Sequence, residues 1–296
     1  MNSIICAICG SSETVVIYNG KIRNGAPGHM TDYDVEVFRC SECYAIWHKK
    51  VSEINHFYTS DNYREIMGET ATLSDYYRKH DAEILDKLIY SGTSIYRDKL
   101  FMDIGCGGGG FADYVRGVAR SIVLVEPNEN FATQLRNKGY EVFSYSNEAV
   151  LKYANAVELI TSYDVIEHVD NPCGFLRLIY KLLVPGGNAF IGTPTEYPVL
   201  RELLGTEFDS FVFSTQHLWV FSQRSLELMA YECGFSRIEV KFYQRFGIGN
   251  LISWLQTSEP RGEAIYSFIT PALNSLYKNE MAKENTAEYL VLELEK

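Results

Sequence analysis

A glycine-rich turn between two apolar runs constrains the fold of this chain most strongly. Residues 101–111 read FMDIGCGGGGF; the run KLFMDIG predicts a short buried strand and the run GFADYVRGV predicts a helix. Gly105, Gly107 and Gly110 fit the pattern G-x-G-x-x-G, in which a bare backbone lets a nucleotide-like ligand approach the turn. Taken alone, this pattern favours a dinucleotide, and its specificity is low.

Acidic residues around this turn favour a different ligand. Asp103 lies two residues before Gly105, where a carboxylate suits an ammonium group better than a pyrophosphate. The next predicted strand, SIVLVEPN, ends at Glu126, which is suited to accept hydrogen bonds from both hydroxyls of a ribose and disfavours a 2′-phosphate. A later strand, ELITSYDVIEHV, ends in a polar and acidic cluster at the same edge. Enzymes that bind NAD also have an acidic residue at the position of Glu126. Asp103 and the polar and acidic cluster are therefore the features that argue against a dinucleotide.

Strands and helices alternate along the rest of the chain. NENFATQLRNKG and DNPCGFLRLIYKLLVPGG predict helices, and Pro185-Gly186-Gly187 are expected to stop the second one before a strand at NAFIGTP. SQRSLELMAYECGF predicts a helix capped by Ser222 and ended near Gly234, followed by the strands SRIEVKFY and AEYLVLELE. This alternation predicts an α/β fold with a doubly wound, Rossmann-like sheet that binds ligands at the carboxyl ends of its strands.

Four cysteines in the first fifty residues predict a metal site. Cys6 and Cys9 form one C-x2-C pair, and Cys40 and Cys43 form a second pair after an interval of 30 residues. Two thiolates from each of two turns complete the tetrahedral coordination of structural Zn2+. The runs TVVIY and YDVEVF predict strands between the pairs, so we expect a small β zinc ribbon.

The charge balance argues against a nucleic-acid partner. The formal net charge is −11, and residues 1–50 carry five Lys/Arg and five Asp/Glu. A ribbon of this composition, with a zinc–tetrathiolate centre of about −2, has no electrostatic reason to bind phosphates. No apolar run approaches the length of a membrane span and the first residues do not resemble a leader, so we expect a cytoplasmic protein with no membrane partner.

Three segments are expected along the chain. They are a zinc ribbon at 1–50, a helical connector or cap at 51–99, and a ligand-binding domain at 100–296 with a lid at 195–217 and a helical insert at 247–284. Within the connector, SDYYRKHDAEILDKLIYSG predicts a helix with Ser74 as its N-cap and Gly92 as its stop.

The ordered motifs DIGCGGG, EPN, YDVIEHV and LLVPGGNAFIGTP resemble those of class I methyltransferases that depend on S-adenosyl-L-methionine (SAM). The resemblance covers roughly residues 75–245 and implies SAM as the cofactor; an NAD-dependent enzyme is the alternative. It implies that Asp103 lies near the amino end of SAM and that Glu126 holds the ribose diol. The full set of implied cofactor-binding residues is Asp103, Gly105, Cys106, Gly107, Glu126, Pro127, Asn128, Tyr163 and Asp164. In this set, Cys106 is expected to fill space rather than to react.

Two histidines are candidates for a catalytic base. His168 follows the strand that carries Tyr163 and Asp164, and its alternative role is to fix that loop by a hydrogen bond. His217 lies at the end of the expected lid, where a packing role is the alternative.

A narrower resemblance concerns the acceptor. A zinc ribbon before this core is similar to nucleotide-sugar C-methyltransferases and their relatives of bacterial glycan and natural-product pathways. That family has an acidic residue and a histidine where this chain has Gln216 and His217, and it continues into a further C-terminal domain that this sequence lacks. We therefore expect transfer to an oxygen of a small sugar-like or phosphorylated metabolite. The alternatives are a C-methyltransferase of a nucleotide sugar, an RNA methyltransferase with a zinc ribbon, and a scaffold protein without activity.

Overall fold

The computed structural model describes residues 4–49, 72–259 and 265–296. The chain divides into two compact units that interleave along the sequence. Unit 1 comprises Met1–Ser52, Gly192–Met229 and Glu239–Leu292, and unit 2 comprises Glu53–Ile191, Ala230–Ile238 and Glu293–Lys296. The first part of the expected helical connector, up to residue 71, lies outside the described residues. The three consecutive segments expected from the sequence stay a prediction.

Unit 2 contains the parallel strands predicted around the glycine-rich turn. They are β4 (Leu100–Ile104), β5 (Ser121–Val125), β6 (Glu141–Phe143) and β7 (Val157–Tyr163). Strand β4 pairs in parallel with β5 and β7, and β5 pairs in parallel with β6. The complete sheet has the strand order β10-β11-β8-β7-β4-β5-β6, where β8 is Leu183–Pro194, β10 is Arg237–Tyr243 and β11 is Tyr289–Glu295. The Rossmann-like α/β fold predicted from the sequence is confirmed.

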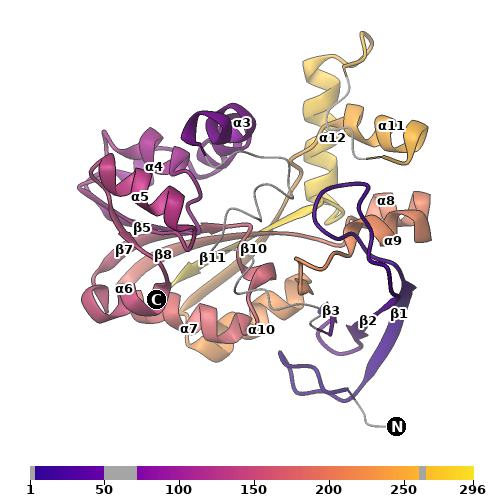
Figure 1. Cartoon of the computed structure of the whole chain (residues 1–296), viewed down its shortest axis with the longest axis horizontal. Coiled ribbons are helices and arrows are strands. Elements are labelled where there is room, and N and C mark those ends of the chain that lie inside the picture. Colours follow the sequence, from indigo (N-terminus) through magenta and orange to yellow (C-terminus); the bar gives the residue numbers. More distant parts are fainter. Residues whose placement is uncertain (1–3, 50–71, 260–264) are drawn as a thin grey trace. The chain divides into compact units, whose positions relative to one another are not determined.

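Helices cover both faces of these parallel strands. They are α3 (Leu73–Ser91), α4 (Gly110–Val115), α5 (Glu129–Asn137), α6 (Ser146–Tyr153) and α7 (Pro172–Leu182), with short 3-10 turns at Ser94–Tyr96 and Ile166–His168. In Figure 1, α3, α4 and α5 lie on one face of the strands, and α6 and α7 lie on the other. Ile84 and Leu88 of α3 are buried against Phe101 and Phe111, because apolar residues at helical spacing form one face.

Two helix boundaries differ from the sequence-based expectation. Helix α3 begins earlier than predicted, because Thr72 rather than Ser74 is the N-cap and its hydroxyl accepts a hydrogen bond from the Asp75 amide. Helix α7 ends at Leu182, so Pro185-Gly186-Gly187 lie inside strand β8 instead of stopping the helix. The Gly186 amide donates to the Lys296 carbonyl at 2.8 Å, which explains how a Pro-Gly-Gly run is held in a strand.

Other predicted ends are confirmed. Helix α3 ends at Gly92, which has a φ of 72° and donates its amide to the Leu88 carbonyl. Helix α10 (Gln223–Cys233) follows Ser222, whose hydroxyl accepts from the Ser225 amide at 3.0 Å. Among the described residues, no helix is both long enough and apolar enough to cross a membrane.

Unit 1 contains a small antiparallel sheet that combines three strands near the start of the sequence with one strand about 170 residues later. Its strands are β1 (Thr14–Gly20), β2 (Val35–Cys40), β3 (Ile46–His48) and β9 (Trp219–Val220), in the order β1-β2-β3-β9. Its helices are α8 (Pro198–Leu204), α9 (Thr206–Val212), α11 (Ile248–Thr257) and α12 (Pro271–Lys283). The predicted ribbon strands are present, and β9 extends the ribbon by a strand that the sequence did not predict.

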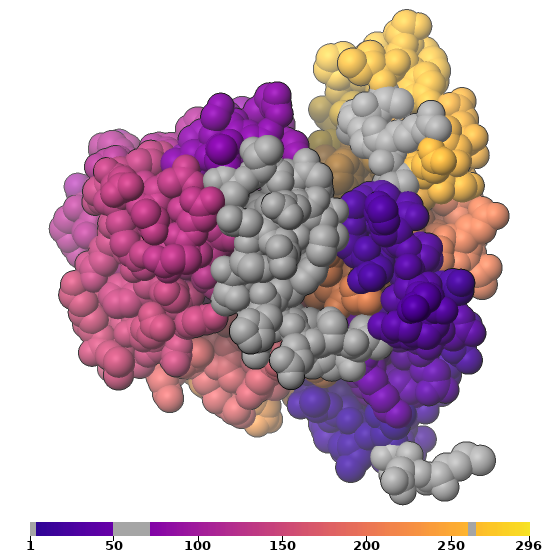
Figure 2. Space-filling view, in the orientation of Figure 1, coloured from indigo at the N-terminus to yellow at the C-terminus, as the bar shows by residue number. Residues whose placement is uncertain are grey.

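The ribbon shares one hydrophobic core with the helices of unit 1. Ile22, Val37 and Ile46 of the ribbon are buried in the same cluster as Phe208 of α9 and Trp254 of α11. In Figure 2, the indigo residues of the ribbon and the orange residues near position 210 form part of one surface, as expected from the ring contact of Tyr18 with Phe213 at 5.7 Å. The ribbon therefore belongs to the hydrophobic core of unit 1 and is not an appendage.

Candidate cofactor and metal sites

The glycine-rich turn of unit 2 has a backbone that only glycine adopts without strain. Gly105 and Gly107 have φ angles of 75° and 54°. A Cβ on Gly105 would lie 2.3 Å from a methyl group of Val165, and a Cβ on Gly107 would lie 2.6 Å from the Tyr76 hydroxyl oxygen. Cys106 between them is buried, and its thiol lies 3.7 Å from the Gly107 carbonyl oxygen; its expected space-filling role stays a prediction.

Glu126 is bound directly to this turn. It lies just beyond β5, is 6% exposed, and accepts a hydrogen bond from the Gly107 amide at 2.8 Å. Its other carboxylate oxygen accepts from the Asn128 amide at 2.9 Å, and Asn128 caps α5 by accepting from the Phe131 amide. The structure thus brings Gly107, Glu126 and Asn128 together beside the glycine-rich turn, with Pro127 between the last two.

Asp103 lies in the buried part of the same sheet, two residues before the turn. It is 5% exposed and accepts a hydrogen bond from the Thr161 hydroxyl of the neighbouring strand β7 at 2.7 Å. Burial raises the pKa of Asp103 to about 6, although the Thr161 hydrogen bond and the positive charge of Lys87 act in the opposite direction. A cationic ligand close to Asp103 would stabilise the ionised form of this buried carboxylate.

The end of β7 carries Tyr163 and Asp164. Asp164 has a φ of 57° and accepts a hydrogen bond from the Lys87 ammonium group at 2.8 Å, and the same ammonium group lies 5.1 Å from the Tyr163 ring centroid. Burial would lower the pKa of Lys87, but the carboxylates of Asp164 and Glu83 outweigh it and raise that pKa. The Tyr163 hydroxyl is buried and has no hydrogen-bond partner in the described part of the chain.

Helix α3 supplies contacts that the sequence analysis did not assign. Besides Lys87, it places the Tyr76 ring against Gly107 and Gly108, where this ring stacks on His80 at a centroid distance of 4.4 Å. The Tyr77 hydroxyl donates to the Gly108 carbonyl at 3.0 Å. A signal was present, since Lys87 falls between the apolar core positions Ile84 and Leu88 on one helix face.

The two candidate bases lie in different units. His168 is in unit 2, partly buried, and its amide donates to the Val165 carbonyl at 3.0 Å. His217 is in unit 1, in the turn before β9, where its amide donates to the Ser214 hydroxyl at 3.1 Å. The neighbouring Gln216 is buried, and the catalytic role of either histidine stays a prediction.

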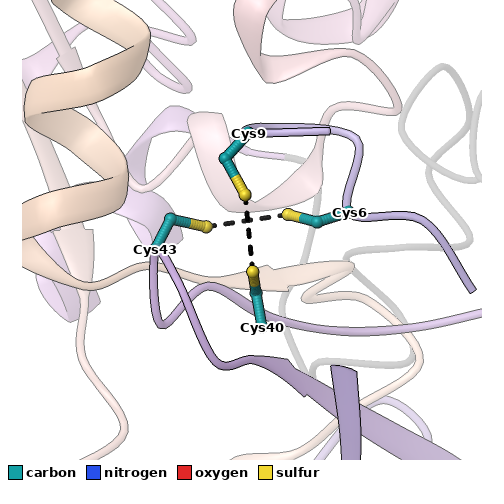
Figure 3. A group of neighbouring side chains, drawn as sticks. All are labelled: Cys6, Cys9, Cys40 and Cys43. Atoms are coloured by element: carbon teal, nitrogen blue, oxygen red, sulfur yellow. Dashed lines mark hydrogen bonds between the residues drawn. The ribbon is translucent and has the colours of Figure 1, made fainter. Parts of the chain in front are cut away.

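The four cysteines of the ribbon converge on one point (Figure 3). The sulfur atoms of Cys6 and Cys43 are 3.6 Å apart, those of Cys9 and Cys40 are 3.4 Å apart, and all four lie within 4.8 Å of one another. A zinc ion at its usual distance of about 2.3 Å from four thiolates requires sulfur–sulfur distances of about 3.8 Å. The arrangement therefore fits a tetrahedral zinc site and excludes two disulfides in this structure. Without a metal ion, the hydrogen bond between Cys6 and Cys43 lowers the pKa of Cys6 and raises the pKa of Cys43.

Comparisons with solved structures agree with the fold. A SAM-dependent methyltransferase from Archaeoglobus fulgidus superposes with a TM-score of 0.52 at 15% identity, covering 75% of this chain and 98% of that one. Phosphoethanolamine N-methyltransferase 2 from Haemonchus contortus, solved with phosphomonomethylethanolamine and S-adenosylhomocysteine, gives a TM-score of 0.50 at 14% identity, covering 95% of this chain and 71% of that one. At these identities the likeness concerns the fold alone.

Curated relatives match the central part of the chain. A ubiquinone biosynthesis O-methyltransferase from Caulobacter sp. (strain K31) is 27% identical over 110 residues, which is 35% of this chain and 44% of that protein. The mitochondrial ubiquinone biosynthesis O-methyltransferase of Mus musculus is 31% identical over 126 residues, covering 37% of this chain and 34% of that protein. The chain thus spans less than half the length of these relatives. A family model described as a methyltransferase domain matches residues 76–240, more than half of the chain, which therefore belongs to this methyltransferase family.

Proposed function

We propose that this protein transfers a methyl group from SAM to a hydroxyl group of a small molecule. The observation that carries the proposal is the double hydrogen bond of Glu126, which ties the Gly107 and Asn128 amides to one carboxylate beside a turn that only glycine fits. Bound at this turn, SAM would supply a sulfonium methyl group that is open to in-line displacement.

Each residue of the proposed cofactor site has a role that its chemistry supports. Glu126 would accept hydrogen bonds from the ribose diol, and Pro127 and Asn128 would line the adenosine side. Gly105 and Gly107 would let the backbone approach the methionine part, with Cys106 filling the space behind. Asp103 would attract the ammonium group, because a buried carboxylate with a raised pKa is stabilised by a nearby cation. Tyr163 and Asp164, held by Lys87, would close the site near the acceptor.

An oxygen acceptor is favoured over carbon and nitrogen. The curated relatives are named O-methyltransferases, and Gln216 replaces the acidic partner that a carbanion-forming base would need beside His217. An alcohol has a high pKa, so its oxygen needs a base to become a nucleophile, and His217 or His168 would take that proton. Within this class we propose a sugar-like or phosphorylated metabolite of a bacterial glycan or natural-product pathway as the acceptor.

We propose further that Cys6, Cys9, Cys40 and Cys43 hold a structural zinc ion. Four ligands complete the coordination sphere and leave no open position for a substrate. The metal would therefore stabilise the ribbon and take no part in the reaction.

Titration calorimetry with SAM, S-adenosylhomocysteine and NAD tests the cofactor. We expect both sulfur nucleosides to bind and NAD not to bind, together with a SAM-dependent rise in the melting temperature. The acceptor class is tested by incubating protein and SAM with panels of sugars, sugar phosphates, phenols and amines and measuring S-adenosylhomocysteine. Binding of NAD alone would overturn the cofactor assignment, and turnover only with amines would overturn oxygen as the acceptor.

A further inference from the structure

The segment that precedes β9 is held along its length by the ribbon. The Arg23 amide donates to the carbonyls of Ser210 and Phe213 at 3.0 and 3.1 Å, and the Thr215 amide donates to the Arg23 carbonyl at 2.9 Å. The Thr215 hydroxyl also donates to the Asn24 side chain at 2.9 Å. All of these residues belong to unit 1, so the loop between β1 and β2 holds the chain segment that immediately precedes His217.

His48 holds the turn that carries His217 itself. This ring is 6% exposed, and its Nε2 lies 2.9 Å from the Ser214 carbonyl oxygen and 3.1 Å from the His217 carbonyl oxygen. A carbonyl oxygen only accepts hydrogen bonds, so a proton on Nε2 is shared between these two oxygens, while Nδ1 lies 2.9 Å from a third acceptor, the Lys49 carbonyl oxygen. One imidazole thereby bridges the first and last residues of a turn of four residues.

The ribbon also fixes the chain beyond the turn. His48 is the last residue of β3, and β3 pairs with β9 through Ile46 with Val220 and Trp47 with Trp219. The second cysteine pair lies just before β3, at Cys40 and Cys43. The Cys43 carbonyl accepts a hydrogen bond from the Ser222 hydroxyl at 2.6 Å, two residues after β9. Both ends of the turn are therefore anchored to backbone that the cysteine cluster organises.

We propose that His48 is a positioning residue for His217 and that the ribbon is the scaffold through which it acts. This inference rests on the proposed function, because it assigns to the ribbon the task of orienting the candidate base. A base must lie within hydrogen-bond reach of the proton that it removes, and a displacement of about 1 Å can lower a rate about a hundredfold. By donating to the Ser214 and His217 carbonyls, His48 limits the movement of the backbone from which the His217 ring projects.

Three variants separate this role from general stability. His48→Gln replaces the imidazole with an amide group, whose two N–H bonds can donate to both carbonyl oxygens. His48→Leu removes the donor and keeps a buried side chain of similar size. His29→Leu is the matched control, because His29 is an exposed histidine of the same ribbon, in the loop between β1 and β2. Zinc content and SAM affinity of the full-length chain are measured for each variant, and we expect the wild-type values for all three.

The decisive readout is the imidazole signal of His217 in two-bond proton–nitrogen correlation spectra, assigned with His217→Ala. We expect His48→Leu to shift or broaden this signal, while His48→Gln and His29→Leu leave it as in the wild type. With an acceptor from the panel, His48→Leu should lower kcat by about tenfold to a hundredfold with an unchanged KM for SAM. An unchanged His217 signal in His48→Leu, or equal effects of Leu and Gln, would overturn the proposal. The spectra need no turnover, so failure to find an acceptor affects the proposed function and not this inference.

Discussion

The Thr161 hydroxyl donates a hydrogen bond of 2.7 Å to the Asp103 carboxylate across the β4–β7 pair. Because this bond stabilises the ionised form, it opposes the burial that raises the pKa of Asp103 to about 6. SAM affinity should therefore rise with pH through about 6 as Asp103 ionises, and then level off. Thr161→Val should move this midpoint upward by about one pH unit, since a hydrogen bond to a charged group contributes about 1.5 kcal/mol. Calorimetry between pH 5 and 7.5 measures the midpoint, and the exposed Thr133→Val is the control.

Loss of the Glu126 carboxylate should weaken SAM binding most. Glu126→Ala removes the acceptor for the Gly107 and Asn128 amides as well as for the ribose, so we expect an affinity about tenfold to a hundredfold lower. Glu129→Ala, an exposed glutamate at the start of α5, should bind SAM like the wild type. Equal affinities of the two variants would show that Glu126 does not contact the nucleoside.

The Tyr76 ring should be sensitive to any side chain added at Gly108. A Cβ on Gly108 would lie 2.5 Å from a ring carbon of Tyr76, so Gly108→Ala must displace this ring and should lower both the melting temperature and SAM affinity. Gly117→Ala meets nothing within 4 Å and is the control. If the clash is the cause, the double variant with Tyr76→Ala recovers part of the loss; no recovery would point to the backbone.

Substitution of each histidine by alanine shows which of the two side chains is the base. His217→Ala and His168→Ala should both keep SAM affinity, and the variant that lacks the true base should lose about a hundredfold or more in kcat together with the acidic limb of the pH profile. Exposed His29→Ala should keep full activity. Unchanged turnover in both variants would mean that alignment of the acceptor with SAM is sufficient for the reaction. The pH profile of kcat should then have no acidic limb that depends on either histidine.

Zinc binding can be tested by removing one thiol at a time. Cys9→Ser and Cys40→Ser should lose the single bound zinc ion, measured by plasma mass spectrometry, and should lower the melting temperature by about 5 °C or more. Cys233→Ser is the control, because this partly buried thiol lies outside the cysteine cluster. Retention of a full equivalent of zinc by Cys40→Ser would contradict a four-thiolate site.

Features that depend on neighbours in sequence were predictable. The glycine-rich turn, the acidic end of β5 and the spacing of the cysteine pairs each depend on a few consecutive residues, and the structure places them as expected. Boundaries were less certain, because Thr72 and Ser74 are both accepted N-cap residues and the fold selects Thr72 although serine is the more favoured cap.

Contacts between distant residues were not predictable from pattern. The ion pair of Lys87 with Asp164 joins residues 77 positions apart, and no periodicity indicates which acidic residue a helix lysine will meet. The pairing of β3 with β9 was missed for the same reason, since β9 has only two residues and lies directly after the turn of His217.

The pairing of β3 with β9 also limits how this chain can mature on the ribosome. The first three strands of the ribbon emerge early, but the strand that covers the open edge of β3 is synthesised only after residue 218. Until then that edge exposes unpaired backbone groups to other nascent chains. A metal ion bound early by the four cysteines would hold the first three strands together during this interval.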